Sequence, residues 1–132
     1  MQRNPYYKDL MAEIYNFLQE RILFAKEEGI EEERIIVDPG IGFGKRLEDN
    51  YEIIRRLGEL KGLGRPILLG PSRKSFIGLT LNLPPEERLE GSLSASVCAV
   101  IQGVNILRVH DVLSTKRAVA MAYAILKGRK NA

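Results

Sequence analysis

The sequence predicts an α/β fold with parallel strands, and three observations support it. First, three short runs, RIIVD, RPILLG and NILRVHD, are apolar without alternation, which is typical of strands buried on both faces. Second, longer segments with apolar residues at helical spacing separate these runs. Third, each run ends in polar residues, and the carboxyl ends of parallel strands are where such proteins bind ligands.

The predicted elements follow one another within a single domain, residues 1–132. The first helix starts at Asn4-Pro5, an N-cap followed by a first-turn proline, and stops at Gly29. Three further helices are predicted, over residues 49–61, 86–102 and 114–127. Residues 79–87 are predicted as a loop. Helices that alternate with strands imply right-handed crossovers, so the order is α-β-α-β-α-β-α with three parallel strands.

The composition favours a globular domain that handles small anionic ligands. Of its 132 residues, 45% are hydrophobic and 28% are charged, as in folded chains. The net charge of +3 is too small to indicate nucleic-acid binding. No apolar run reaches the roughly 18 residues of a membrane-spanning helix. The opening MQRNPYYKDL has no apolar centre, so no signal peptide is expected.

Cys98 is the only cysteine, which excludes a disulfide within this sequence and makes a reducing cytoplasm the expected location. It lies in SASVCAVIQG, an apolar helical stretch. A small buried thiol is therefore expected at this position rather than a nucleophile.

The glycine-rich segment VDPGIGFGKR, residues 37–46, resembles two phosphate-binding motifs and fits neither. In a P-loop, serine or threonine would stand where this sequence has Arg46. The dinucleotide motif G-x-G-x-x-G also fails, because the spacing here is G-x-G-x-G. The glycines are therefore expected to let the backbone approach a ligand closely.

The polar strand ends bring an acid, several cations and the only histidine to one rim. Asp38 ends the first run, Lys74 follows the second, and Arg108 and His110 lie in the third. Positions i and i+2 of a strand face the same way, so Arg108 and His110 are expected to share an anionic partner. Asp111 is expected to cap the last helix or to orient His110.

Each of these residues also has a purely structural interpretation. Asp38 precedes a proline, and such aspartates commonly cap turns. Arg73 and Lys74 fit a solvated basic turn, and SRKS by itself also fits an anion site. His110 fits a hydrogen-bonded core histidine.

Three segments together, IIVDPGIGFGK, ILLGPSRKSFIG and RVHDV, resemble the C-terminal half of the dihydropteroate synthase family in order and spacing. The resemblance implies the C-terminal portion of a (β/α)8 TIM barrel. It implies a transferase of folate biosynthesis that joins 6-hydroxymethyl-7,8-dihydropterin diphosphate to p-aminobenzoate and releases diphosphate. The resemblance also implies Mg²⁺ as cofactor.

The resemblance assigns residues to each part of the substrates. Asp38 and Lys74 match pterin-binding positions, and Phe43 and Ser75 match positions near the p-aminobenzoate pocket.

Arg108 and His110 match the diphosphate-binding pair, and with Lys74 they are the expected catalytic residues. Cations at this position would neutralise the charge that grows on the leaving diphosphate. No metal ligand is predicted in this chain. The ligands of Mg²⁺ are expected from the substrate diphosphate and the absent N-terminal half.

Members of the family are about twice as long as this chain, which lacks a counterpart of the first five strands. The sequence leaves open whether Met1 is a true start or an internal methionine. The chain alone is expected to be inactive and to pair with a complementary N-terminal half, and the complete enzyme is expected to be a homodimer. Two alternatives remain: the pterin-binding domain of a methyltetrahydrofolate-dependent methyltransferase, and a non-catalytic fragment.

Overall fold

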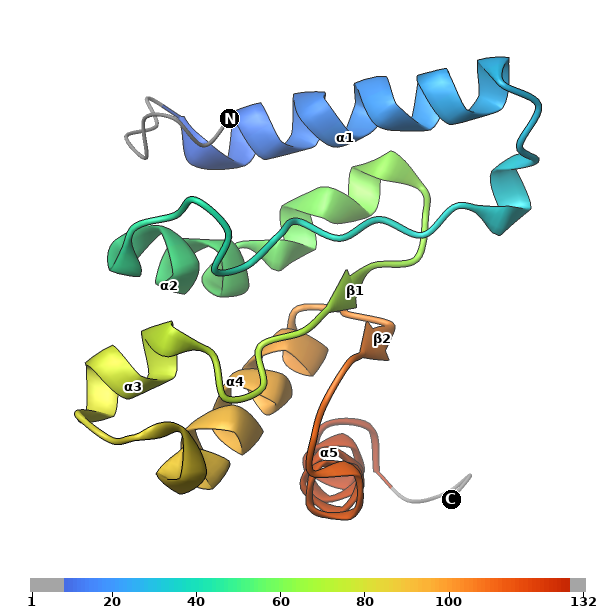
Figure 1. The fold of residues 1–132 in the computed structure, drawn as a ribbon. Helices are drawn as coiled ribbons and strands as arrows, with labels where there is room; N and C mark the ends of the chain where they lie inside the picture. The colour runs from blue at the N-terminus through green and yellow to red at the C-terminus, as the bar shows by residue number, and fades with distance from the viewer. Residues whose placement is uncertain (1–8, 129–132) are drawn as a thin grey trace.

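The computed structural model describes residues 9–128, and they begin with a long helix (Figure 1). Helix α1 spans Leu10–Glu27, and the carboxylate of its N-cap, Asp9, accepts a hydrogen bond from the backbone N–H of Ala12 at 3.2 Å. The predicted start at Asn4-Pro5 lies outside the described residues. The helix ends before Gly29, whose φ of 96° is left-handed, so the predicted stop is confirmed.

The sheet is smaller than the three strands that were predicted. Strands β1 (Leu68–Leu69) and β2 (Ile106–Leu107) pair in parallel, with Leu68 opposite Ile106. The first predicted strand is reduced to a single parallel bridge between Val37 and Ile67. A short 3₁₀ helix, η1 (Glu32–Arg34), precedes this bridge, and Pro39 soon follows it without a backbone N–H to donate. The ladder therefore cannot extend far on either side of Val37.

The helices differ from the prediction at three places. The segment predicted as one helix over 49–61 divides into α2 (Leu47–Arg55) and the 3₁₀ helix η2 (Leu57–Leu63). A short helix, α3 (Ser75–Leu81), was missed because its seven residues include a glycine and a threonine, both weak helix formers. Pro84 and Pro85 hold the next turn as 3₁₀ helix η3 (Pro85–Glu87), so the following helix starts at residue 89 rather than 86.

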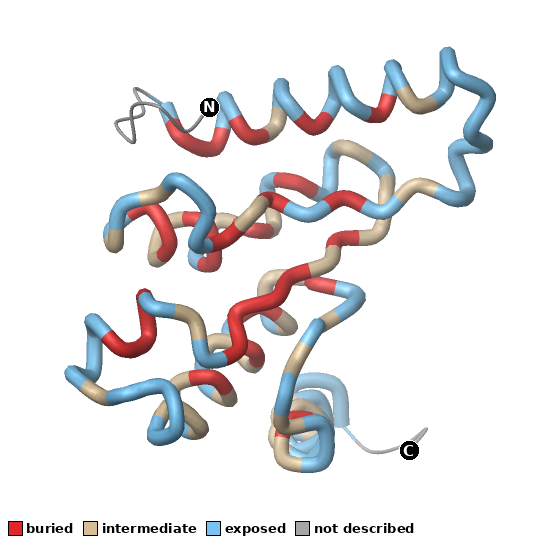
Figure 2. The backbone as a smooth tube through the Cα atoms, in the orientation of Figure 1, coloured by how far each residue is buried: buried red, intermediate tan, exposed pale blue. Residues whose placement is uncertain are grey.

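The last two helices agree closely with the prediction and complete the layers around β1. They are α4 (Leu89–Ile101) and α5 (Val112–Lys127). Helix α1 lies along η2 and α2, α2 in turn contacts α4, and α4 packs against α5, so the helices follow one another alongside the strands (Figure 1). Figure 2 shows the buried residues along β1 and along the inner face of α1, while α5 is largely exposed.

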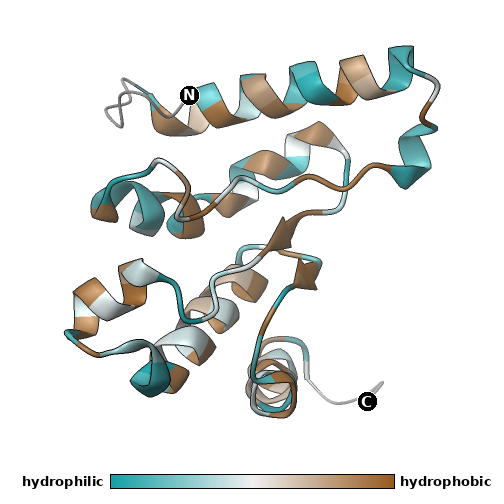
Figure 3. Cartoon of the chain, viewed as in Figure 1, coloured by the Kyte–Doolittle hydropathy of each residue, from teal (hydrophilic) through white to brown (hydrophobic). Residues whose placement is uncertain are grey.

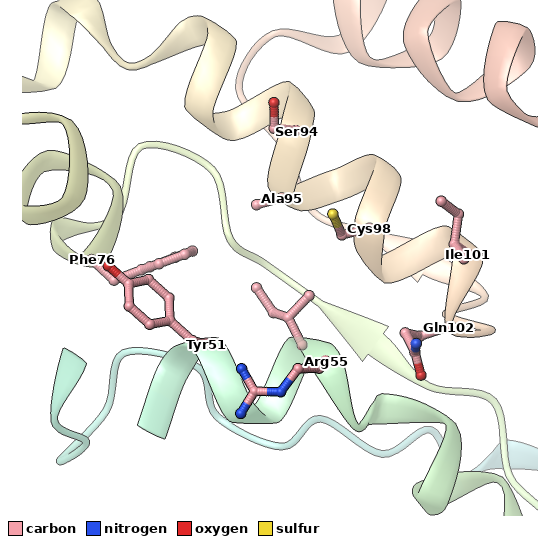
Figure 4. A pocket seen from close by; sticks show the side chains of 9 residues that line it. Tyr51, Arg55, Phe76, Ser94, Ala95, Cys98, Ile101 and Gln102 are labelled. Carbon is pink, nitrogen blue, oxygen red and sulfur yellow. The ribbon is translucent and has the colours of Figure 1, made fainter. Parts of the chain in front are cut away.

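Cys98 is exposed, so the expectation of a buried thiol was wrong. Helix α4 buries a stripe of small residues, Ser92, Ser96 and Ala99, which lets it pack closely against its neighbours. Cys98 falls outside that stripe and borders an apolar groove of about 400 Å³ between α2 and α4, opposite Tyr51 and Arg55 (Figure 4). Among residues 9–128, no helix is both long and apolar enough to span a bilayer.

Candidate functional site

A cavity of about 260 Å³ lies at the carboxyl ends of β1 and β2. The two loops that follow these strands supply its lining residues, which are Gly70, Ser72, Lys74, Arg108, Val109 and His110. Arg108 and His110 lie just after β2 rather than within it, although the Arg108 N–H still donates to the Leu69 carbonyl at 3.0 Å. The structure therefore brings together Lys74, Arg108 and His110, as predicted.

Gly70 makes room for the Arg108 side chain. A Cβ atom at position 70 would lie 3.3 Å from Nε of Arg108, which is tighter than ordinary van der Waals contact. The guanidinium thus lies close against the backbone at the end of β1. Any side chain at this position would force the guanidinium to shift within the cavity.

Lys74 links the cavity to the glycine loop. Its Nζ donates to the Ile41 carbonyl at 2.9 Å and lies 4.7 Å from the centre of the Phe43 ring. Burial lowers the pKa of Lys74, the nearby Arg108 charge lowers it further, and the carboxylate of Asp38 opposes both effects. Lys74 is therefore a partly desolvated cation facing both the acid and the arginine of the site.

Asp38 has the turn-capping contact that its purely structural interpretation requires. Its Oδ1 accepts a hydrogen bond from the Gly40 N–H at 2.8 Å, which closes the turn around Pro39. Among residues 9–128, none is hydrogen-bonded to Oδ2. Capping one oxygen is compatible with a second role for the other, because a carboxylate has four lone-pair sites.

Lys45 holds the glycine loop in shape. Its Nζ donates to the Gly40 carbonyl at 3.1 Å and to the Phe43 carbonyl at 3.0 Å, and burial lowers its pKa. The N–H of Gly42, a residue with φ of 87°, donates to Oδ1 of Asn50 at 2.7 Å. The loop is therefore anchored at its own carbonyls and at helix α2.

Arg46 acts at the start of α2. Its backbone N–H donates to Oδ2 of Asp49 at 2.9 Å, and its guanidinium pairs with the same carboxylate. The two cations of VDPGIGFGKR thus have structural contacts within the loop and at the helix that follows it.

Two contacts join the loop after β1 to the loop after β2, and sequence reasoning missed both. The Ser72 hydroxyl lies 2.8 Å from Nδ1 of His110 and accepts the His110 N–H at 3.3 Å. Arg73 pairs with Asp111 at 2.7 Å, so Asp111 neither caps α5 with its side chain nor orients His110. The one available signal was a serine three positions after the end of β1, in the polar segment SRKS.

Phe43 and Ser75 lie beside the cavity rather than in its lining. Phe43 is 61% exposed, and Ser75 is an exposed residue in the first turn of α3. Their assignment to a p-aminobenzoate pocket stays a prediction.

Among residues 9–128, no three His, Cys, Asp or Glu side chains cluster so that they could hold a metal ion. The cavity is lined by cationic donors, whereas Mg²⁺ requires oxygen ligands.

Most of this chain matches the model of a known protein family. The model of the pterin binding enzyme family matches residues 1–110. The chain belongs to this family. The chain is 50% identical over 125 residues to the dihydropteroate synthase of Clostridium beijerinckii, covering 94% of this chain and 46% of the relative. It is 44% identical to the Escherichia coli K12 enzyme, over 99% of this chain and 46% of that relative.

Solved structures agree with the sequence relatives. The dihydropteroate synthase of Yersinia pestis superposes with a TM-score of 0.92 at 44% identity, covering 96% of this chain and 52% of that structure. The Xanthomonas albilineans enzyme in complex with 7,8-dihydropteroate gives a TM-score of 0.90 at 44% identity, covering 93% of this chain and 47% of that structure. The α/β fold thus matches that of dihydropteroate synthase TIM barrels, and the chain spans about half the length of the curated relatives it matches.

Proposed function

We propose that this chain is the C-terminal part of a dihydropteroate synthase. The proposed reaction breaks the bond between the pterin methylene carbon and the diphosphate oxygen. The amine of p-aminobenzoate forms the new C–N bond and gives up a proton. The observation that carries the proposal is the convergence of Lys74, Arg108 and His110 on one cavity at the strand ends. The relatives named above are dihydropteroate synthases, which favours this function over that of a methyltetrahydrofolate-dependent methyltransferase.

Arg108 and His110 form the proposed diphosphate end of the site. A guanidinium fork matches two phosphate oxygens, and an imidazole N–H adds a third donor. These donors are in place before reaction, so they stabilise the negative charge that develops as diphosphate leaves. No strong general base is needed, because the incoming aromatic amine is already a nucleophile.

Asp38 and Lys74 form the proposed pterin end. A carboxylate oxygen suits the adjacent N–H donors of an aminopyrimidine edge, and Oδ2 is the oxygen of Asp38 that the turn leaves for this. Lys74, held at the Ile41 carbonyl, interacts electrostatically with both this acid and Arg108. Phe43 and Ser75 flank this end, where p-aminobenzoate would approach.

The remaining parts of the proposal concern groups outside these residues. Mg²⁺ is proposed to bind through oxygens of the substrate diphosphate and through the N-terminal half. A cytoplasmic location is supported by the single cysteine. The complete enzyme is proposed to be a homodimer.

The chain alone is proposed to be inactive, with a complementary N-terminal half as its partner. Residues 9–128 contain two strands and a bridge, which cannot close a barrel around both substrates. The test mixes the 132-residue chain with the N-terminal half of the Clostridium beijerinckii relative and measures dihydropteroate formation. Turnover is expected only in the mixture, and comparable turnover by the chain alone would contradict this.

A crossed binding experiment tests the two ends of the site separately in that complex. Asp38→Asn is expected to weaken binding of a pterin without diphosphate by about ten- to a hundredfold, because a charge-assisted hydrogen bond contributes about 1.5–3 kcal/mol. Arg108→Ala is expected to weaken the binding of pyrophosphate by a similar factor and to leave the affinity for the pterin nearly unchanged. Calorimetry measures both, with Arg117→Ala on α5 as the control. Unchanged pyrophosphate affinity in both Arg108→Ala and His110→Ala would place the site elsewhere.

A further inference from the structure

Ser72 stands out because it is polar, buried and directly bonded to His110. Its residue is only 7% exposed, although it lies in a loop at the edge of the cavity. Its Oγ lies 2.8 Å from Nδ1 of His110 and 3.3 Å from the His110 backbone nitrogen. One hydroxyl therefore contacts both the ring and the backbone of the only histidine in the sequence.

The hydrogen atoms of this contact can be assigned by counting donors. A serine hydroxyl has one hydrogen to donate and two lone pairs to accept. The backbone N–H of His110 can only donate, so it occupies a lone pair of Oγ. Among residues 9–128, Nδ1 of His110 is the one acceptor within hydrogen-bond distance of the Ser72 hydrogen.

A buried hydroxyl that fails to donate loses free energy, so the arrangement in which Ser72 donates is favoured. Nδ1 then accepts, and the proton of a neutral imidazole must be on Nε2. The opposite tautomer would leave the Ser72 hydrogen without an acceptor and would present a bare lone pair at Nε2. A lone pair would repel an anion in the cavity, whereas an N–H would bind one.

We propose that Ser72 is a positioning residue: it fixes the orientation and tautomer of the His110 ring so that Nε2–H is presented as an anion donor. Ser72 itself acts only through His110.

The surrounding contacts keep Ser72 in place. The neighbouring Arg73 has a left-handed backbone with φ of 58°, a conformation that is costly for a residue with a Cβ. Its N–H donates to the Ser92 hydroxyl at 2.8 Å, and its carbonyl accepts from Arg88 at 2.9 Å. Together with the pair between Arg73 and Asp111, these bonds fix the turn that carries Ser72.

The inference depends on the proposed function only in naming diphosphate as the anion. The ring contact can be tested without any ligand, because His110 is the only histidine of the chain. The chain is labelled with ¹⁵N-histidine and studied alone and in complex with the unlabelled N-terminal half. The spectrum then contains the two ring nitrogens of His110 only.

At a pH where the ring is neutral, the expected spectrum shows an unprotonated, hydrogen-bonded Nδ1 and a protonated Nε2. Ser72→Ala is expected to move the Nδ1 resonance toward that of a free ring nitrogen. Ser72→Thr keeps a hydroxyl and is expected to restore it, and Ser94→Ala, on the exposed side of α4, is the control. A proton on Nδ1 in the unmodified chain would overturn the proposal, even if Ser72→Ala failed to fold. So would a His110 spectrum unchanged by Ser72→Ala.

Pyrophosphate affinity distinguishes the positioning of His110 by Ser72 from the proposed diphosphate site at Arg108 and His110. Ser72→Ala is expected to weaken the binding of pyrophosphate by about five- to tenfold, and Ser72→Thr is expected to restore it. If the ring resonances respond as expected while His110→Ala and Arg108→Ala bind pyrophosphate normally, the positioning by Ser72 stands and the diphosphate assignment falls.

Discussion

Helices α1 and α5 are of similar length, yet α1 buries a continuous apolar face within this chain and α5 does not. The buried face of α1 contains five apolar residues, Leu10, Met11, Ile14, Leu18 and Ile22. Helix α5 buries only Thr115 and exposes a larger apolar set, visible as brown segments in Figure 3. That set is Val112, Leu113, Met121, Tyr123, Ile125 and Leu126. A helix so apolar on its exposed surface indicates a missing partner.

The largest expected effect is on the packed side. Ile14 is 1% exposed in the face of α1 that covers the core, so Ile14→Ala should lower the free energy of unfolding by about 2–5 kcal/mol. Phe17→Ala, on the exposed side of the same helix, is the matched control and should cost much less. Urea denaturation of both variants gives the comparison. Equal losses would mean that α1 is not packed as described.

A smaller effect is expected on α5, and only in the presence of the N-terminal half. Met121 and Ile125 lie one turn apart on one flank of α5, and Tyr123 and Leu126 lie on the other. Alanine at both positions of a pair should change the unfolding of the isolated chain by no more than about 0.5 kcal/mol per site. At least one of the two pairs should weaken association with the N-terminal half by about tenfold or more, because a buried apolar side chain contributes about 1.5–3 kcal/mol.

Titration of association by fluorescence anisotropy checks this, with Lys116→Ala as control. Association that is insensitive to both pairs would show that α5 remains uncovered.

The smallest expected effect is on the pH dependence of the free energy of unfolding, compared between a lysine of the site and a lysine of α5. Burial lowers the pKa of Lys74 below its ordinary value of 10.5, so the unfolded chain binds more protons than the folded chain between the two values. The free energy of unfolding should therefore rise with pH in that window. Lys74→Met should reduce this rise, whereas Lys116→Met on α5 should leave it unchanged. Denaturation at several pH values measures the slope, and identical slopes in both variants would contradict the desolvation of Lys74.

The sequence was sufficient for helices α1, α4 and α5 and for the grouping of Lys74, Arg108 and His110, because periodicity and strand ends are local signals. It failed for the strand at Val37, where the extent of the ladder depends on pairing with a distant segment. It also failed for Cys98, since helical periodicity does not say which flank of α4 faces the core. The contacts of Ser72 and Arg73 join loops that are 38 positions apart, so no local pattern could have shown them.

The contacts of Ser72 with His110 and of Arg73 with Asp111 also join the two loops of the proposed diphosphate end. The side chains proposed to bind diphosphate, Arg108 and His110, belong to one crossover unit that runs from β1 through α4 to the loop after β2. The same two contacts tie the first loop of this unit to its last loop. The proposed pterin end takes Lys74 from this unit but also needs Asp38, which precedes the unit, and residues proposed to come from the N-terminal half. The 132-residue chain by itself is therefore expected to bind pyrophosphate better than it binds a pterin.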